Sequence, residues 1–227
     1  PRVAVVVTGS ELVEVSERPA GGQIRNSNQY VLESLIRSVH CEPVVHAVVK
    51  DERLAISEAI SKAVDCDVIC LTGGVSMGAF DFVPDVLVAL GATVHFHKIS
   101  IKPGRPTLFA TLPNGQLVFA LPGNPVSALV GFRLLVAPAL AALQGRLELP
   151  PLLRAELRGT LPAEGPRRAY YPASLSVGGN GGYVAHLLSW HGSGDALGMA
   201  GAQAFIVRPP GSLPAKAGEA VMFIPLV

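Results

Sequence analysis

Four short segments of this sequence combine glycine, hydroxyl-bearing and charged residues in a way that suits the binding of a phosphate or another anion. Glycine permits positive φ angles and lets backbone N–H groups approach an anion closely. Lys102 and Arg105 add positive charge, and Ser127 falls in the first turn of a predicted helix, where free N–H groups favour an oxyanion. The four segments are Thr8-Gly9-Ser10-Glu11-Leu12, Thr72-Gly73-Gly74-Val75-Ser76-Met77-Gly78, Lys102-Pro103-Gly104-Arg105-Pro106 and Leu121-Pro122-Gly123-Asn124-Pro125-Val126-Ser127.

A carboxylate, that of Asp81, stands shortly after the second of these segments, where it could hold a divalent metal that bridges to phosphate oxygens. Taken singly, each feature has an ordinary structural explanation: a turn after a strand, solvated surface cations, or a helix cap. None of the segments is a Walker A or G-x-G-x-x-G motif, so these nucleotide-binding signatures do not apply. Their joint occurrence at predicted strand ends is what favours a binding site.

The first two thirds of the sequence predict the elements that bring these segments together. Runs of apolar, often β-branched residues indicate strands covered on both faces, and they alternate with apolar residues at helical spacing. Asp51 is a candidate N-cap for the second helix, and Pro84 suits the first turn of the third. The predicted strands are residues 3–8, 44–49, 67–71, 93–101, 107–111 and 117–121, and the predicted helices are 28–40, 52–64, 84–90 and 126–143.

This alternation predicts an α/β fold with an open, mostly parallel sheet and helices on both faces. The Pro113-Asn114-Gly115 sequence predicts a hairpin between the last two strands. Because ligands bind such sheets outside the carboxyl ends of the strands, we expect the four segments to meet at one edge.

The last third of the sequence has a different character. The proline-rich residues 149–151 indicate a stiff linker, and little helical periodicity follows them. Short strands separated by turns predict a small all-β sandwich or barrel. The predicted strands are residues 153–157, 168–177, 183–188, 204–208 and 220–225, and the predicted domains are residues 1–148 and 149–227.

Composition excludes several classes of protein. The 227 residues carry 18 Lys and Arg against 17 Asp and Glu, so no basic surface for nucleic acid is expected. Three cysteines argue against a disulfide framework and suit a reducing, cytoplasmic setting, and we expect no secretory leader. The apolar residues 126–143 contain Arg133 and Pro138, which favours a buried helix over a membrane span.

Other candidate sites are weaker. His95 and His97 share a strand face at the spacing of a metal pair, but no Cys or carboxylate partner stands near them in the sequence. Cys66 and Cys70 bracket a buried strand and are best explained as small core residues. No G-x-S-x-G elbow supports a hydrolytic triad.

In this order, the segments resemble the molybdopterin molybdenumtransferase family, which includes bacterial MoeA and the gephyrin E domain. The resemblance covers nearly the whole chain and implies a molybdopterin-binding α/β domain followed by a β-barrel domain. The matching stretches are TGSELVE (8–14), GGQIRNSN (21–28), LTGGVSMGAFDF (71–82), KPGRP (102–106), LPGNPVSA (121–128) and HGSGDALGMAGAQAFIVRP (191–209).

The resemblance implies that molybdate is inserted into adenylylated molybdopterin with release of AMP, and that Mg²⁺ takes part. Asp81, Lys102 and Ser127 would be the catalytic residues, and Arg105 would contact molybdate or phosphate. The implied metal ligands are Asp81, Glu11 and Asn26, and the residues implied to cradle the cofactor are Thr72, Gly73, Gly74, Ser76, Gly78, Arg105, Pro122, Gly123 and Asn124.

Two differences from the family pattern bear on the metal. Many members have Asp where this chain has Ser10 and Asn26, and an asparagine brings no negative charge to Mg²⁺. Two outcomes stay open: a lower Mg²⁺ affinity or reaction rate, or compensation by Glu11. The resemblance also implies a homodimer and an active site shared with upstream domains. A chain that starts at Pro1 is therefore expected to be the C-terminal half of the protein.

Two alternatives stay open. The first is a module of the same fold that binds molybdopterin or docks a protein without turnover. The second is a relative with nucleotide-hydrolase chemistry, similar to the competence-damage-inducible family. The LPGNPVSA stretch and the β-rich tail argue against the second.

Overall fold

The valine run at the start of the chain forms one of the inner strands of a six-stranded sheet. The computed structural model describes residues 1–75, 81–147, 149–179 and 181–226, and in it β1 (Arg2–Val7) is fully buried after its first residue. It pairs in parallel with β4 (Glu42–Val45) and β5 (Val68–Thr72), and β5 pairs in parallel with β9 (Leu117–Leu121). Two antiparallel pairings, of β9 with β8 (Leu108–Thr111) and of β8 with β6 (Thr93–His97), complete the sheet. The order is β4, β1, β5, β9, β8 and β6.

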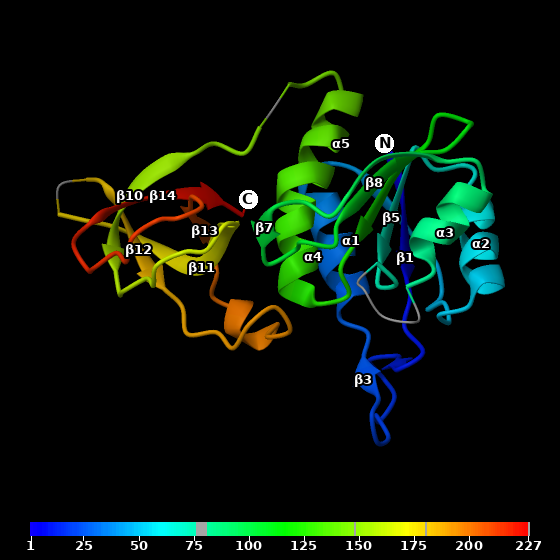
Figure 1. The fold of residues 1–227 in the computed structure, drawn as a ribbon, viewed down its shortest axis with the longest axis horizontal. Helices are drawn as coiled ribbons and strands as arrows, with labels where there is room; N and C mark the ends of the chain where they lie inside the picture. The colour runs from blue at the N-terminus through cyan, green and yellow to red at the C-terminus, as the bar shows by residue number, and fades with distance from the viewer. Residues whose placement is uncertain (76–80, 148, 180, 227) are drawn as a thin grey trace.

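Helices cover both faces of this sheet, as predicted (Figure 1). One face packs against α1 (Asn28–Ser38), α4 (Pro125–Gly131) and α5 (Ala137–Leu143), and the other against α2 (Arg53–Lys62) and α3 (Val83–Ala89). Side chains of β1 alternate between the two cores, Val3, Val5 and Val7 to one and Ala4 and Val6 to the other. This explains why the strand is a continuous apolar run.

The apolar segment after β9 is one helix of 19 residues, Pro125–Leu143, long and apolar enough by length and composition to cross a membrane. It is 56% buried, because it lies between the sheet and the second unit. Pro138 does not end it. The five residues before α5, Phe132–Val136, form a π-helical turn, which accommodates a proline that has no N–H to donate. The Arg133 Nε donates to the carbonyl of Pro225 at 2.7 Å, so this charge tethers the helix to the C-terminal strand.

The second unit is a closed barrel of five strands, because β12 pairs with both β10 and β11. Its own core contains Phe223 and Ile206, and a separate cluster with Phe205 and Tyr170 packs against Val126 and Val130 of the long helix. The strands are β10 (Leu153–Arg158), β14 (Ala220–Pro225), β13 (Ala204–Arg208), β11 (Arg168–Val177) and β12 (Tyr183–Leu187), with a short 3-10 helix, η2 (Leu197–Met199).

The structure corrects the predicted strand over residues 93–101. The strand stops at His97, because Lys98 adopts a positive φ of 71° that breaks the extended backbone. The chain then forms β7 (Ile101–Lys102), which joins the barrel sheet by pairing in parallel with β11. The loop after Lys102 is therefore held between the two units.

Two predicted helix caps are also wrong. The N-cap of α2 is Glu52, and the Asp51 carboxylate accepts a hydrogen bond from the Ser10 N–H at 3.0 Å instead. The N-cap of α3 is Phe82 and not Asp81. Asp51 therefore ties the loop after β1 to the loop before α2.

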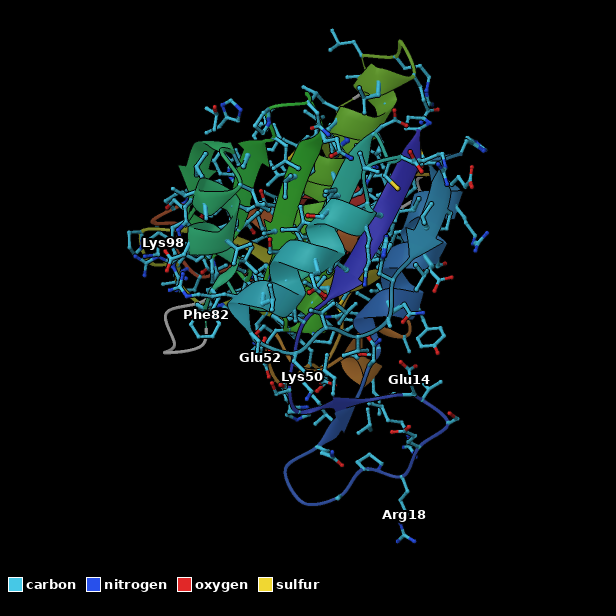
Figure 2. The ribbon with its side chains drawn as sticks, turned by 90° about the vertical axis from the view of Figure 1, so that its right-hand side faces the viewer. Glu14, Arg18, Lys50, Glu52, Phe82 and Lys98 are labelled. Atoms are coloured by element: carbon cyan, nitrogen blue, oxygen red, sulfur yellow. The ribbon has the colours of Figure 1, made fainter. Side chains whose placement is uncertain are left out.

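A two-stranded arm, β2 (Leu12–Val13) and β3 (Ile24–Arg25), projects from the edge of the sheet at which β1 ends. Figure 2 shows Glu14 and Arg18 on this arm, with Lys50, Glu52 and Phe82 at the edge from which it projects. The arm extends the surface around the carboxyl ends of the parallel strands.

Gln116 fixes the register of the strands that carry the site. Its buried side-chain amide donates to the carbonyls of Ala63 and Cys66 at 2.8 and 2.6 Å, which joins the β8–β9 hairpin to the chain entering β5. Replacing Gln116 by alanine leaves two buried carbonyls without this donor, so we expect unfolding free energy to fall by about 2 kcal/mol. Urea denaturation measures it. Gln23→Ala, which truncates an exposed glutamine of the arm, is the control, and an equal loss in both variants would contradict this role.

Candidate functional site

A cleft of about 1010 Å³ opens at the carboxyl ends of the parallel strands, where the sequence predicts the site. It is lined by loops from both units, and it is the largest of the cavities described. The polar and glycine residues of the lining are Thr8, Glu11, Arg25, Asn26, Ser27, Asn28, Gly74, Lys102, Gly104, Arg105, Gly123, Asn124, Ser127, Arg167, Gly192, Ser193 and Gly194.

Three strand ends converge tightly at the base of the cleft. The Thr8 N–H donates to the Thr72 carbonyl at 2.8 Å, and the Gly73 N–H donates to the Leu121 carbonyl at 3.2 Å. Gly73 has a positive φ of 94°, and a Cβ placed on it would lie 2.3 Å from the Thr8 carbonyl oxygen. A Cβ on Gly123 would be 3.6 Å from the Gly73 Cα. Glycine at position 73 is therefore required for the loops to meet.

Asn28 links a fourth element to these loops. Its buried Nδ2 donates to the Gly123 carbonyl at 2.7 Å, while its Oδ1 has no hydrogen-bond partner within the described part of the chain. The buried Thr8 hydroxyl, also in the cleft wall, is likewise without one. Buried polar atoms are normally hydrogen-bonded, so these two atoms are suited to a bound ligand.

Of the four cations that line the cleft, Arg25 lies on β3, and the other three come from β7, the loop after it and the barrel. Lys102 ends β7, Arg105 follows in the next loop, and both are exposed, while Arg167 directly precedes β11. The parallel pairing of Arg168 with Ile101 and of Ala169 with Lys102 brings Arg167 beside Ser100, immediately before β7. None of the three cations forms an ion pair with a described residue. They are free to bind an anion.

A segment of the barrel unit closes the cleft over the start of α4. The Ser193 carbonyl accepts the Val126 N–H at 3.0 Å, and its hydroxyl accepts the Asn124 Nδ2 at 2.8 Å. Ser127, one residue further into the helix, is buried and lines the cleft. The first turn of the long helix therefore contributes both a side chain and its positive dipole end to the site.

The structure brings most of the sequence-predicted site residues together. Thr72 and Gly73 lie beneath the lining, and Thr72 is fully buried. Ser76 and Gly78 lie outside the described residues. The predicted residues that line the cleft are Glu11, Asn26, Gly74, Lys102, Arg105, Pro122, Gly123, Asn124 and Ser127.

The predicted metal ligands do not all line the cleft. Asp81 is not among the described lining residues, although the Val83 N–H donates to the Gly74 carbonyl at 3.3 Å and so brings the start of α3 to the cleft edge. The Asn26 Oδ1 already accepts the Gln29 N–H at 3.3 Å. The described residues hold no group of three or more His, Cys, Asp or Glu placed for a metal ion. Of the predicted ligands, Glu11 does bring a carboxylate to the cleft lining, and Mg²⁺ commonly takes only one or two carboxylates together with ligand phosphates.

From the sequence alone, Thr8, Asn28 and Ser193 fall within stretches that match the family but are not identified as individual site residues, and Arg167 and Trp190 are not identified at all. Thr8 ends a predicted strand and Asn28 begins a predicted helix, so their positions were a usable signal. The other three depend on how the barrel packs against the sheet, for which the sequence carries no local signal.

Comparison with known proteins agrees with this geometry. Residues 4–142 match the family described as "Probable molybdopterin binding domain", and residues 154–226 match "MoeA C-terminal region (domain IV)". The chain belongs to the molybdopterin-binding domain family. The resemblance to molybdopterin molybdenumtransferases is thereby confirmed for the first unit and extends through the barrel.

Individual relatives point the same way. The chain is 35% identical over its whole length to a molybdopterin molybdenumtransferase of Nostoc sp. and 33% identical over 99% of its length to one of Staphylococcus aureus. It superposes with a TM-score of 0.86 on a molybdopterin biosynthesis MoeA protein of Pyrococcus horikoshii, at 31% identity, and covers 55% of that chain. The match covers 53% of the Nostoc protein and 54% of the Staphylococcus one, so this chain spans about half the length of its relatives.

Proposed function

We propose that the cleft binds adenylylated molybdopterin and that the complete protein uses it to insert molybdate into the dithiolene with release of AMP. The observation that carries the proposal is the meeting of glycine loops, unpaired cations and a helix start at one cleft of about 1010 Å³. Membership of the molybdopterin-binding domain family and the naming of similar proteins as molybdenumtransferases support it.

In this proposal each group has a defined task. Lys102, Arg105 and Arg167 neutralise the phosphate and molybdate oxygens, and Ser127 donates its hydroxyl and helix N–H to an oxyanion. The Thr8 hydroxyl and the Asn28 Oδ1 accept hydrogen bonds from N–H groups of the pterin ring. Glu11 and Asp81 would hold Mg²⁺, which when bound polarises the pyrophosphate that is cleaved.

Titration calorimetry of this chain with molybdopterin tests the binding, with and without Mg²⁺. We expect saturable binding, and we expect Asp81→Ala to weaken it by about tenfold only when Mg²⁺ is present. Asp85→Ala is the matched control, because Asp85 is an exposed residue of α3 whose carboxylate forms an ion pair with Arg53. Equal affinities for Asp81→Ala and the unmodified chain in Mg²⁺ would contradict the metal role of Asp81.

One observation favours a second candidate, a binding module without turnover. Asn26 occupies a position where many family members have a carboxylate, and its oxygen is already engaged by Gln29. Molybdate-dependent AMP release by the full-length protein separates the two. Release supports the transferase, and tight binding without release supports the module.

The proposal includes three further points. The unit of residues 1–148 and the barrel of residues 149–227 act together on one ligand, the full-length protein is a homodimer, and it acts in the cytoplasm. Light scattering and cell fractionation of the full-length protein test the last two.

A further inference from the structure

Residues 190–198 form a tight turn that supplies a wall of the cleft. Trp190, Ser193 and Ala196 line the cleft, together with Gly192 and Gly194. Backbone hydrogen bonds within the turn run from Asp195 to Gly192 at 3.1 Å and from Ala196 to Gly194 at 3.0 Å. Asn124, the N-cap residue of α4, donates its Nδ2 to the Ser193 hydroxyl at 2.8 Å, and the Val126 N–H of α4 donates to the Ser193 carbonyl at 3.0 Å. Ser193 can keep these contacts only while residues 190–198 stay in a closed turn.

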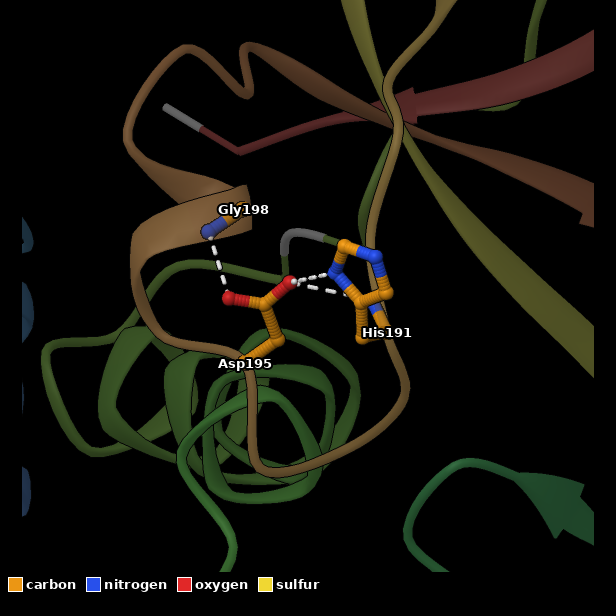
Figure 3. Close-up of polar contacts among 3 residues, drawn as sticks. All are labelled: His191, Asp195 and Gly198. Carbon is orange, nitrogen blue, oxygen red and sulfur yellow. Dashed lines mark hydrogen bonds and ion pairs between the residues drawn. The ribbon is translucent and has the colours of Figure 1, made fainter.

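The Asp195 carboxylate supplies that closure (Figure 3). One oxygen, Oδ1, accepts the Gly198 N–H at 2.8 Å, and the other, Oδ2, accepts the His191 N–H at 2.9 Å and contacts the His191 Nδ1 at 3.2 Å. The carboxylate therefore joins the start of the turn to η2 at its end. The hydrogen bonds from Gly198 and then His191 lower the pKa of Asp195, so the carboxylate is ionised at neutral pH.

The fit around the carboxylate is close. A Cβ on Gly198 would lie 2.5 Å from the Asp195 Oδ2 and 3.1 Å from the Trp190 Cβ. By contrast, a Cβ on Gly201, three residues further on, would meet nothing within 4 Å.

We infer that Asp195 is a positioning residue, whose carboxylate closes residues 190–198 into the turn that holds Ser193 on the first turn of α4 and so completes the ligand cleft. Asp195 is not among the described lining residues, so it acts through Ser193. The His191 ring, which is 89% exposed, contributes little, because an exposed ion pair is weak. The effect of Asp195 on ligand binding rests on the proposed function. The closure of the turn by Asp195 does not.

The chain offers a direct reporter of this turn, because Trp190 is its only tryptophan. Acrylamide quenching of its fluorescence measures how accessible the indole is, without any ligand. We expect Asp195→Ala to raise the quenching constant about twofold and to weaken molybdopterin binding about tenfold, as for the loss of hydrogen bonds to a charged group. Asp195→Asn keeps one hydrogen-bond acceptor, so its quenching constant and its affinity are expected to lie between those of Asp195→Ala and those of the unmodified chain.

Glycine variants test the geometry without removing the charge. Gly198→Ala displaces the carboxylate and is expected to reproduce the effect of Asp195→Ala, while Gly201→Ala and His191→Ala stay close to the unmodified chain. Circular dichroism and the thermal midpoint show whether each variant is folded. If Asp195→Ala does not fold, Asp195→Asn and Gly198→Ala decide the question.

Quenching and binding that are unchanged in Asp195→Asn, Asp195→Ala and Gly198→Ala would overturn the inference. If the unmodified chain does not bind molybdopterin, the proposed function fails while quenching still tests the turn. If the unmodified chain binds and the variants bind equally well despite increased quenching, the turn is closed by Asp195 but does not complete the cleft, and the inference is overturned on that point.

Discussion

Replacing Gly73 by alanine is expected to destabilise the chain and abolish ligand binding at accessible concentrations. The added Cβ would lie 2.3 Å from the Thr8 carbonyl oxygen and 2.6 Å from the Thr8 hydroxyl oxygen. Both distances are shorter than 3.0 Å, which Cβ contacts in proteins essentially never are. The loops after β1 and β5 must then separate, at the point where they also meet Gly123. We expect a loss of about 2 kcal/mol or more in unfolding free energy, from strain at a positive φ and the clash together.

Calorimetry and urea denaturation measure the two effects of Gly73→Ala. Gly22→Ala is the matched control, because Gly22 has a similar positive φ of 80° but nothing within 4 Å of an added Cβ. The control separates the cost of the backbone conformation from the cost of the contact. If the two variants lose the same stability and bind molybdopterin equally well, the close approach of the strand ends does not shape the site.

The second large effect is expected for Arg167→Ala. Arg167 is partly buried in the cleft wall and forms no ion pair with a described residue, so its charge is available to a phosphate or to molybdate. A hydrogen bond to a charged group contributes about 1.5–3 kcal/mol, so the Kd for molybdopterin is expected to rise by about ten- to a hundredfold. Arg167→Lys keeps the charge but loses the two-pronged geometry, and its affinity is expected to be intermediate.

Salt dependence gives Arg167 a second readout. Binding by the unmodified chain is expected to weaken as ionic strength rises, and less steeply in Arg167→Ala, because one screened contact is missing. Arg154→Ala is the control, since Arg154 is exposed on the barrel and lines a different cavity. Affinity in Arg167→Ala that matches Arg154→Ala at every salt concentration would show that Arg167 does not contact the ligand.

The predictable part of the site is the part built by local sequence. Gly73 and Gly123 follow buried strands, and a parallel sheet necessarily brings such strand ends to one edge. Burial on both faces makes β1 and β5 continuous apolar runs, so their ends can be located from the residues alone. Cys70 sits within one of these runs, and burial raises the pKa of its thiol to about 12, as expected for a core residue.

The parts that escaped prediction depend on contacts between distant elements. Residues 93–101 have the composition of one strand, yet Lys98 breaks it and β7 pairs with β11 of the barrel, far along the chain. Arg167 reaches the cleft only through that pairing, and Ser193 only because the barrel docks on the long helix. Asp51 has the sequence context of a helix cap but is captured by the Ser10 N–H. In each case a tertiary contact overrides a local preference.

The central claim is that this cleft is the molybdopterin site, and amide chemical-shift mapping on the isotope-labelled chain tests it most directly. On titration with molybdopterin, we predict that shifts concentrate on Thr8, Gly74, Lys102, Ser127 and Ser193, which lie far apart in the sequence but together line the cleft. Shifts that instead concentrate on the barrel cavity lined by Arg154, Glu156 and Tyr183, or that spread without saturating, would contradict the claim.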